Sequence, residues 1–76
     1  MIPRGLEDHL NIDAEVMHGD LCFRGTRVPM TVLLDNIAEG MGLEEFLQAY
    51  PSVSRNQVLA VLEWESRAIR EAAGMR

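Results

Sequence analysis

A chain of 76 residues, 47% apolar and 25% charged, has the composition of one small globular domain, which excludes wholesale disorder. Its net charge of −5 and pI near 4.8 exclude a protein that binds nucleic acid through bulk positive charge, because phosphate contacts need local cations. No apolar run approaches the roughly 20 residues of a membrane-spanning helix, and residues 1–11 have no apolar block of the signal-peptide kind. We therefore expect a cytoplasmic protein.

The cysteine and histidine residues predict neither a disulfide nor a metal site. Cys22 is the single cysteine, so no internal disulfide can form, and His9 and His18 stand on separate segments without metal-ligand spacing. Neither histidine lies beside a plausible nucleophile, and the sequence has no glycine-rich phosphate loop or motif-held pair of carboxylates. We expect no cofactor, no metal and no enzymatic activity.

The amino-terminal part of the chain predicts a loose arm followed by a small β-hairpin. Residues 1–8 show no periodicity, which is typical of a flexible arm. Residues 9–13 alternate polar and apolar side chains, and residues 21–23 form the next extended segment, so the region 9–28 predicts a hairpin. Because two strands alone are marginal in water, this hairpin must pack on the helices or pair with a second chain.

A turn and a first helix are predicted next. Gly25, which can take a positive φ, lies in a turn over residues 24–27. A helix is predicted over residues 31–39, with Thr31 as its cap or first-turn residue and Gly40 at the left-handed position after its end. The apolar residues that share one side of this helix are Met30, Leu33, Leu34, Ile37 and Ala38.

The second half of the chain predicts a pair of helices joined by a tight turn. A helix over residues 43–50 is indicated by an apolar stripe at i, i+3, i+4 and i+7, namely Leu43, Phe46, Leu47 and Tyr50. Pro51 ends it, and Ser54 with Gln57 forms a capping box that opens a helix over residues 55–72. Helices joined in this way can cross steeply in the helix-turn-helix arrangement, which serves DNA-binding and purely structural domains alike.

The predicted helix over residues 55–72 has a glutamate on its apolar face. Glu65 falls in the middle of a stripe formed by Val58, Val61, Leu62, Ala68, Ile69 and Ala72. A lone buried carboxylate is costly, so either an arginine pairs with Glu65 or the helix has passed the edge of the globule at this point. Trp64 lies on the opposite face, where it either marks an interface or is covered by the first helix or the arm.

Three elements together resemble the small bacterial "domain of unknown function 433" family. They are residues 18–29, which end in Gly-Thr-Arg-Val-Pro, residues 37–41 with Glu-Gly-Met, and residues 50–54 with Tyr-Pro. The resemblance covers about residues 9 to 69. This sequence departs from the family pattern at Leu21, where the family usually has proline. It also departs at Phe23 and Met30, where smaller β-branched residues are usual.

The resemblance implies a mainly α fold, a three-helix homeodomain-like helix-turn-helix domain, here with a small amino-terminal β-hairpin. It also implies an antitoxin that binds and neutralises a PIN-like ribonuclease toxin and represses its own operon. A chain this short has a core worth only about 3 to 5 kcal/mol, so self-association would stabilise it, and we expect a homodimer.

The first candidate for DNA binding is the turn that carries Arg24 and Arg27. Their guanidinium groups and the exposed N–H groups of the turn could converge on a phosphate. The alternative is structural: one arginine pairs with a carboxylate such as Glu65, Glu39 or Asp35 and pins the hairpin to the helices.

The second candidate for DNA binding is the start of the last helix. In a helix-turn-helix the first residues of the second helix reach base edges, and arginine, asparagine and glutamine suit bidentate base contacts. The residues at this position are Ser54, Arg55, Asn56 and Gln57. Capping already explains the serine and the glutamine, however, and Glu63 and Glu65 further along would repel phosphates.

The carboxy-terminal part of the last helix is the candidate partner-binding surface, with Trp64, Arg67 and Arg70. The arginines complement the helix dipole, and against a nuclease with an acidic metal site an inserted arginine could compete for the carboxylates. On the resemblance to the family, the predicted function is an antitoxin-like protein, with repression of its own operon as a secondary activity. The alternative is a helix-turn-helix DNA-binding regulator that works without a toxin partner.

Overall fold

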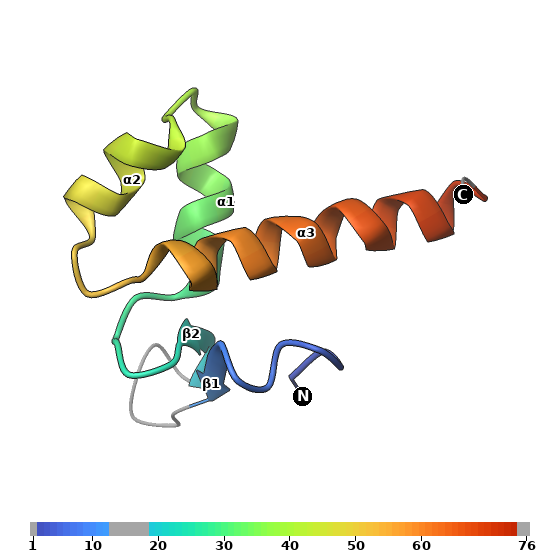
Figure 1. The fold of residues 1–76 in the computed structure, drawn as a ribbon, viewed down its shortest axis with the longest axis horizontal. Coiled ribbons are helices and arrows are strands. Elements are labelled where there is room, and N and C mark those ends of the chain that lie inside the picture. Colours follow the sequence, from blue (N-terminus) through green and yellow to red (C-terminus); the bar gives the residue numbers. More distant parts are fainter. Residues whose placement is uncertain (1, 13–18, 75–76) are drawn as a thin grey trace.

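The computed structural model describes residues 2–12 and 19–74, and in them the chain forms a two-stranded sheet and three helices. The elements in order are β1 (Leu10–Ile12), β2 (Leu21–Phe23), α1 (Met30–Ala38), α2 (Leu43–Ala49) and α3 (Arg55–Ala72) (Figure 1). The predicted mainly helical fold with an amino-terminal hairpin is confirmed. The observed helix bounds differ from the predicted ones by one residue at most, whereas His18 in the hairpin loop lies outside the described residues.

The hairpin is antiparallel and is buried at the end where Leu10 pairs with Phe23. Leu10 of β1 stands opposite Phe23 of β2, and Ile12 stands opposite Leu21. Leu10 and Phe23 are fully buried, whereas Ile12 is exposed. Two strands of three residues are too short to be stable alone. The packing of Leu10 and Phe23 against the helices therefore stabilises the hairpin.

The turn after β2 is held by the side chain of Thr26. Its hydroxyl donates to the Phe23 carbonyl at 2.8 Å and accepts the Val28 N–H at 3.0 Å. Gly25 has a φ of +79°, which a side chain would strain. The predicted turn is thus present, and it brings Pro29 back beside Cys22, directly before α1 begins.

The segment before the hairpin contributes to the core. Its backbone turns back on itself, because the N–H of Leu6 donates to Pro3 at 3.1 Å and the N–H of Leu10 donates to Leu6 at 2.9 Å. Leu6 is only 2% exposed and packs with the residues of the helices. One apolar residue therefore anchors the stretch that the sequence presents as an arm without periodicity.

The ends of α1 differ in how they are capped. Thr31 lies in the first turn, but the residue at the cap position is Pro29 and no side chain caps the helix. At the other end the N–H of Gly40 donates to Ile37 at 2.9 Å and that of Met41 donates to Asn36 at 2.9 Å. With Gly40 at a φ of +99°, this is a Schellman motif, as the glycine at that position predicts.

The core lies where α1, α2 and the start of α3 meet the hairpin. Phe46 of α2 is its centre, with the ring of Phe23 at 6.5 Å and the ring of Tyr50 at 4.8 Å between centroids. The buried apolar residues of this cluster are Leu6, Leu10, Phe23, Leu33, Phe46, Val53, Val58 and Val61. Every element of the chain thus contributes to one core.

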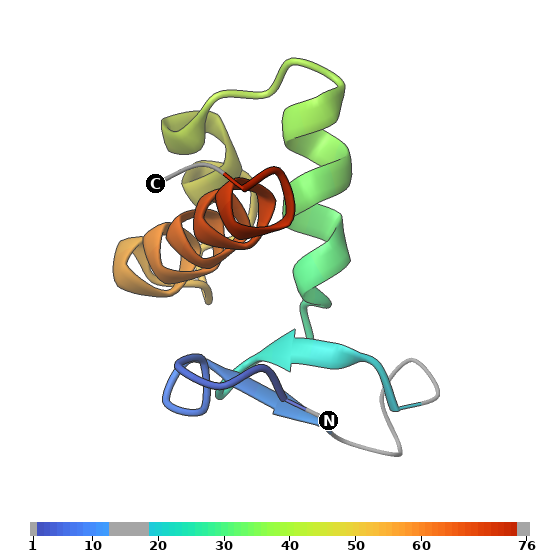
Figure 2. The same ribbon diagram turned by 90° about the vertical axis from the view of Figure 1, so that its right-hand side faces the viewer.

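α3 extends beyond this core. Its first half lies between the α1–α2 pair and the hairpin, and its second half runs past α1 (Figures 1 and 2). Val58 and Val61 are buried, but Ile69, further along the same stripe, is 64% exposed. The radius of gyration of 12.6 Å reflects this extension, since a compact domain of this length is expected to have about 11 Å.

Candidate partner-binding surface

The first side chain of α3 is held by α2. Arg55 and Glu44 form a bidentate ion pair, with Nη1 to Oε2 at 2.6 Å and Nη2 to Oε1 at 2.7 Å. Through this hydrogen bond Arg55 lowers the pKa of Glu44 below its ordinary value, and Glu44 raises the pKa of Arg55. The guanidinium group of Arg55, the first residue of the predicted recognition helix, is therefore paired within the chain.

Ser54 and Gln57 form the predicted capping box. Ser54 Oγ accepts the Gln57 N–H at 3.2 Å, and Gln57 Oε1 accepts the Ser54 N–H at 2.9 Å. Gln57 Nε2 also donates to the carbonyl of Arg24 at 2.9 Å, which ties the hairpin turn to α3. Asn56 is exposed and makes no side-chain hydrogen bond to any described residue, so of these four it alone has its side chain uncommitted.

Arg24 connects the turn to the amino-terminal segment rather than to a carboxylate. Its Nη2 donates to the carbonyl of Glu7 at 2.8 Å. Within the described residues, the ion pairs are Arg55–Glu44 and Arg67–Glu63, so neither Arg24 nor Arg27 makes the carboxylate pair that the structural alternative expected. Arg27 is exposed and is the arginine of this turn that remains available for a ligand.

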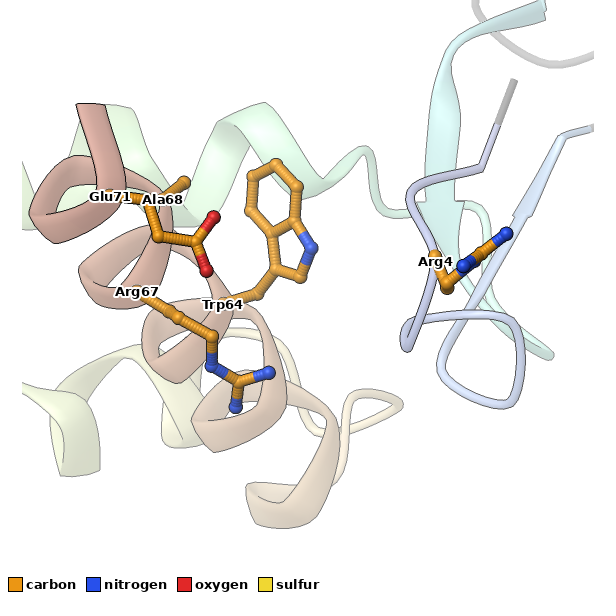
Figure 3. A pocket seen from close by; sticks show the side chains of 5 residues that line it. All are labelled: Arg4, Trp64, Arg67, Ala68 and Glu71. Carbon is orange, nitrogen blue, oxygen red and sulfur yellow. The ribbon is translucent and has the colours of Figure 1, made fainter.

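Trp64 is half-buried and packs against the core cluster. It also lines an open pocket of about 270 Å³ between the amino-terminal segment and α3, together with Arg4, Arg67, Ala68 and Glu71. Figure 3 shows the carboxylate of Glu71 beside the indole, the guanidinium group of Arg67 below the Trp64 side chain, and that of Arg4 across the pocket on the amino-terminal segment. The indole therefore has one part in the core and one part available to a ligand.

The two arginines of the candidate partner-binding surface lie side by side. Arg67 and Arg70 line a second open pocket, of about 300 Å³, with Glu63 and Ser66. Arg67 pairs with Glu63 at only 3.8 Å and both side chains are mostly exposed, so this ion pair adds little to stability. Arg70 lies in the last turn of α3 and forms no ion pair with any described residue.

The stripe around Glu65 is exposed at its far end. Glu65 is half-buried, and no described arginine pairs with it. Leu62 is half-buried, and Ile69 is exposed. Of the two explanations for an acid on this face, the structure favours the one in which the helix has passed the edge of the globule.

Arg4 and Glu71 line these surfaces but are not among the candidates predicted from the sequence. Glu71 shares the face of Trp64 because seven residues make two helical turns, so the spacing held a usable signal. Arg4 could not be found this way, because only the folded chain brings the amino-terminal segment beside α3.

The described part of the chain contains no group of three or more histidine, cysteine or acidic residues placed to hold a metal ion. Within it, no helix is both long and apolar enough to cross a membrane.

The comparisons with known proteins identify a family of unknown function. The model of the family described as "Protein of unknown function (DUF433)" matches residues 10–64. The chain is also similar in fold to a crystal structure of a DUF433 member protein from Anabaena variabilis, with 20% sequence identity and a TM-score of 0.70 over 92% of this chain and 80% of that one. Among curated proteins, none matches this sequence.

Proposed function

The chain belongs to the DUF433 family, and from that premise we propose that it is an antitoxin-like protein that binds and neutralises a PIN-like ribonuclease. The observation that carries the proposal is the second half of α3, which leaves the globule with its apolar stripe uncovered. Ile69 is 64% exposed there and Ala72 is exposed, whereas Ala68 is half-buried. Exposed apolar side chains rimmed by charges are typical of protein-binding surfaces.

The charges beside this stripe fit a nuclease partner. Arg67 and Arg70 stand next to each other on the exposed side of α3, and Arg70 has no ion-pair partner among the described residues. A guanidinium group binds carboxylates in a bidentate geometry, so Arg70 is suited to occupy an acidic metal site. In this proposal the apolar stripe supplies the contact area and Arg70 supplies the inhibition.

The test is co-purification with the PIN-like protein encoded beside this chain, followed by a ribonuclease assay. The wild type should bind that protein and abolish its activity. Ile69→Asp should prevent binding, whereas Arg70→Ala should bind and inhibit less well. Glu39→Gln, a change of an exposed residue at the carboxy-terminal end of α1, is the matched control. Absence of any complex with the wild type would refute the proposal.

A second candidate function is DNA binding by α2 and α3 as a homeodomain-like helix-turn-helix. It is favoured by Asn56 and Arg27, whose exposed side chains have no described partner. A homodimer would present a pair of α3 helices to two half-sites of the DNA. Sedimentation measurements would show whether the chain is a dimer. In a gel-shift assay with the upstream region, Arg27→Ala and Asn56→Ala should abolish the shift, and a wild type without a salt-sensitive shift would remove this candidate.

A further inference from the structure

The pocket between the amino-terminal segment and α3 combines an aromatic face with a carboxylate. Trp64 is half-buried, packs against the core cluster and lines the pocket. The carboxylate of Glu71 lies on the side of that ring in Figure 3. An indole face attracts cations through its quadrupole, and a neighbouring carboxylate adds a charge-assisted hydrogen bond.

Glu71 lacks an ionic partner in a place where a carboxylate is unfavourable. It forms no ion pair with any described residue. It lies in the last turn of α3, where the helix dipole already places partial negative charge. A cation bound beside Glu71 would offset both its own charge and that of the helix end.

The arginines of the pocket do not turn it into an anion site. In Figure 3 the guanidinium group of Arg4 lies across the pocket from the indole and from Glu71, and that of Arg67 lies below the Trp64 side chain, on the side away from the Glu71 carboxylate. Arg67 also pairs with Glu63, at 3.8 Å. The chain as a whole carries a net charge of −5, which favours a basic group over an acidic one at its surface.

From these observations we propose that the pocket receives the side chain of an arginine or lysine from the protein partner. The cationic group stacks on the exposed face of Trp64 and donates hydrogen bonds to the carboxylate of Glu71. The proposal rests on the proposed function for the identity of the partner, but not for the chemistry of the pocket. With Arg70 directed at an acidic site of that partner, the contact would use charges of both signs from consecutive residues in the last turn of one helix.

Trp64 is the single tryptophan of the chain, so its fluorescence reports on this pocket alone. The full chain is titrated with acetyl-Gly-Arg-Gly-amide, with the neutral analogue that has citrulline in place of arginine, and with the analogue that has glutamate. We expect a saturable change in fluorescence with the arginine peptide only. In Glu71→Gln the apparent Kd for that peptide should rise at least fivefold, and in Glu39→Gln it should not change.

Two results of the peptide titration would overturn the proposal. Equal responses to the arginine and citrulline peptides, including no response to either, would mean that the pocket does not select a cation. A stronger response to the glutamate peptide would mean that Arg4 and Arg67 make it an anion site. Because Glu71 is exposed at the end of α3, its substitution leaves the fold intact and the comparison of variants is valid.

The partner measurement separates this proposal from the proposed function. If the wild type binds the PIN-like protein, Glu71→Gln should weaken that binding at least fivefold while Glu39→Gln leaves it unchanged. An unchanged affinity for Glu71→Gln would overturn the pocket proposal and leave the antitoxin proposal standing. If the wild type does not bind that protein, the antitoxin proposal fails, and the peptide titration alone decides whether the pocket is a cation site.

Discussion

The two halves of α3 have the same apolar period but different surroundings. In the first half, Val58 and Val61 are buried against the other elements, and Gln57 is bonded both to its own helix and to the hairpin turn. In the second half, Ile69 is exposed, and Arg70 and Glu71 have no described partners. One amphipathic helix thus contributes to the core over part of its length and leaves the rest of its apolar stripe exposed.

This difference teaches that a stripe alone does not identify a core. The period of the apolar residues predicts which side of a helix is apolar, but tertiary packing determines how far along the helix that side is buried. The glutamate on the stripe marks the change, because a lone carboxylate is tolerated only where water reaches it.

Val61→Ala should have the largest effect, a loss of about 2 kcal/mol in the free energy of unfolding, because it removes buried methyl groups and leaves a cavity. The valine is 1% exposed in the wild type. Urea unfolding followed by circular dichroism measures the loss. A change below about 0.5 kcal/mol, the range of surface substitutions, would mean that the first half of α3 is not the anchored half.

Gln57→Ala should cost about 1 to 2 kcal/mol, since it removes the reciprocal cap and the bond to the Arg24 carbonyl together. Asn56→Ala is the matched control, being the neighbouring exposed residue without such bonds. Urea midpoints of the two variants should differ clearly. Equal midpoints would contradict the role given to the glutamine.

Glu44→Gln should have a smaller effect that depends on pH. The pKa of Glu44 is lowered in the folded chain from its ordinary value of 4.5 by the hydrogen bond from Arg55, so the folded state binds fewer protons than the unfolded state in acid. The stabilisation is complete above pH 4.5 and is lost as the pH falls through the lower, folded pKa. The variant should therefore lose less stability on acidification than the wild type, in urea midpoints measured across that range. Glu39→Gln should follow the wild type.

Ile69→Ala should have the smallest effect on stability, within about 0.5 kcal/mol, because the side chain is already in water. Binding of the PIN-like partner should weaken in the same variant, measured by calorimetry. A destabilisation as large as that of Val61→Ala would show that the second half of α3 also belongs to the core. It would contradict the difference between the two halves of the helix.

Much of the fold follows from local signals in the sequence. The Ser54–Gln57 spacing, Pro51 and Gly40 each determine one end of a helix through chemistry within a few residues, and the structure has those ends. Thr31 was ambiguous because a proline before a helix can occupy the cap position without any side-chain bond. The antitoxin role, the DNA candidates and the dimer stay predictions.

The candidate surfaces were less accessible to sequence reasoning, because they depend on which segments meet. Arg55 was expected to face a ligand, but Glu44, eleven residues earlier, reaches it across the turn. Arg24 was expected to bind either a phosphate or a carboxylate, and a main-chain carbonyl binds it instead. Carbonyl partners leave no trace in side-chain identity, so pattern analysis cannot anticipate them.

The amide of Gln57 bears on the order of assembly. Its oxygen can find the Ser54 N–H as soon as the local turn forms, since the partners are three residues apart, whereas its nitrogen must wait for a carbonyl 33 residues away. Closing that long loop has an entropic cost, and a side chain already fixed by the cap adds little more. We therefore expect the hydrogen bond between Gln57 and Ser54 to form before the one between Gln57 and Arg24, so that the hairpin docks onto a helix end that is already capped.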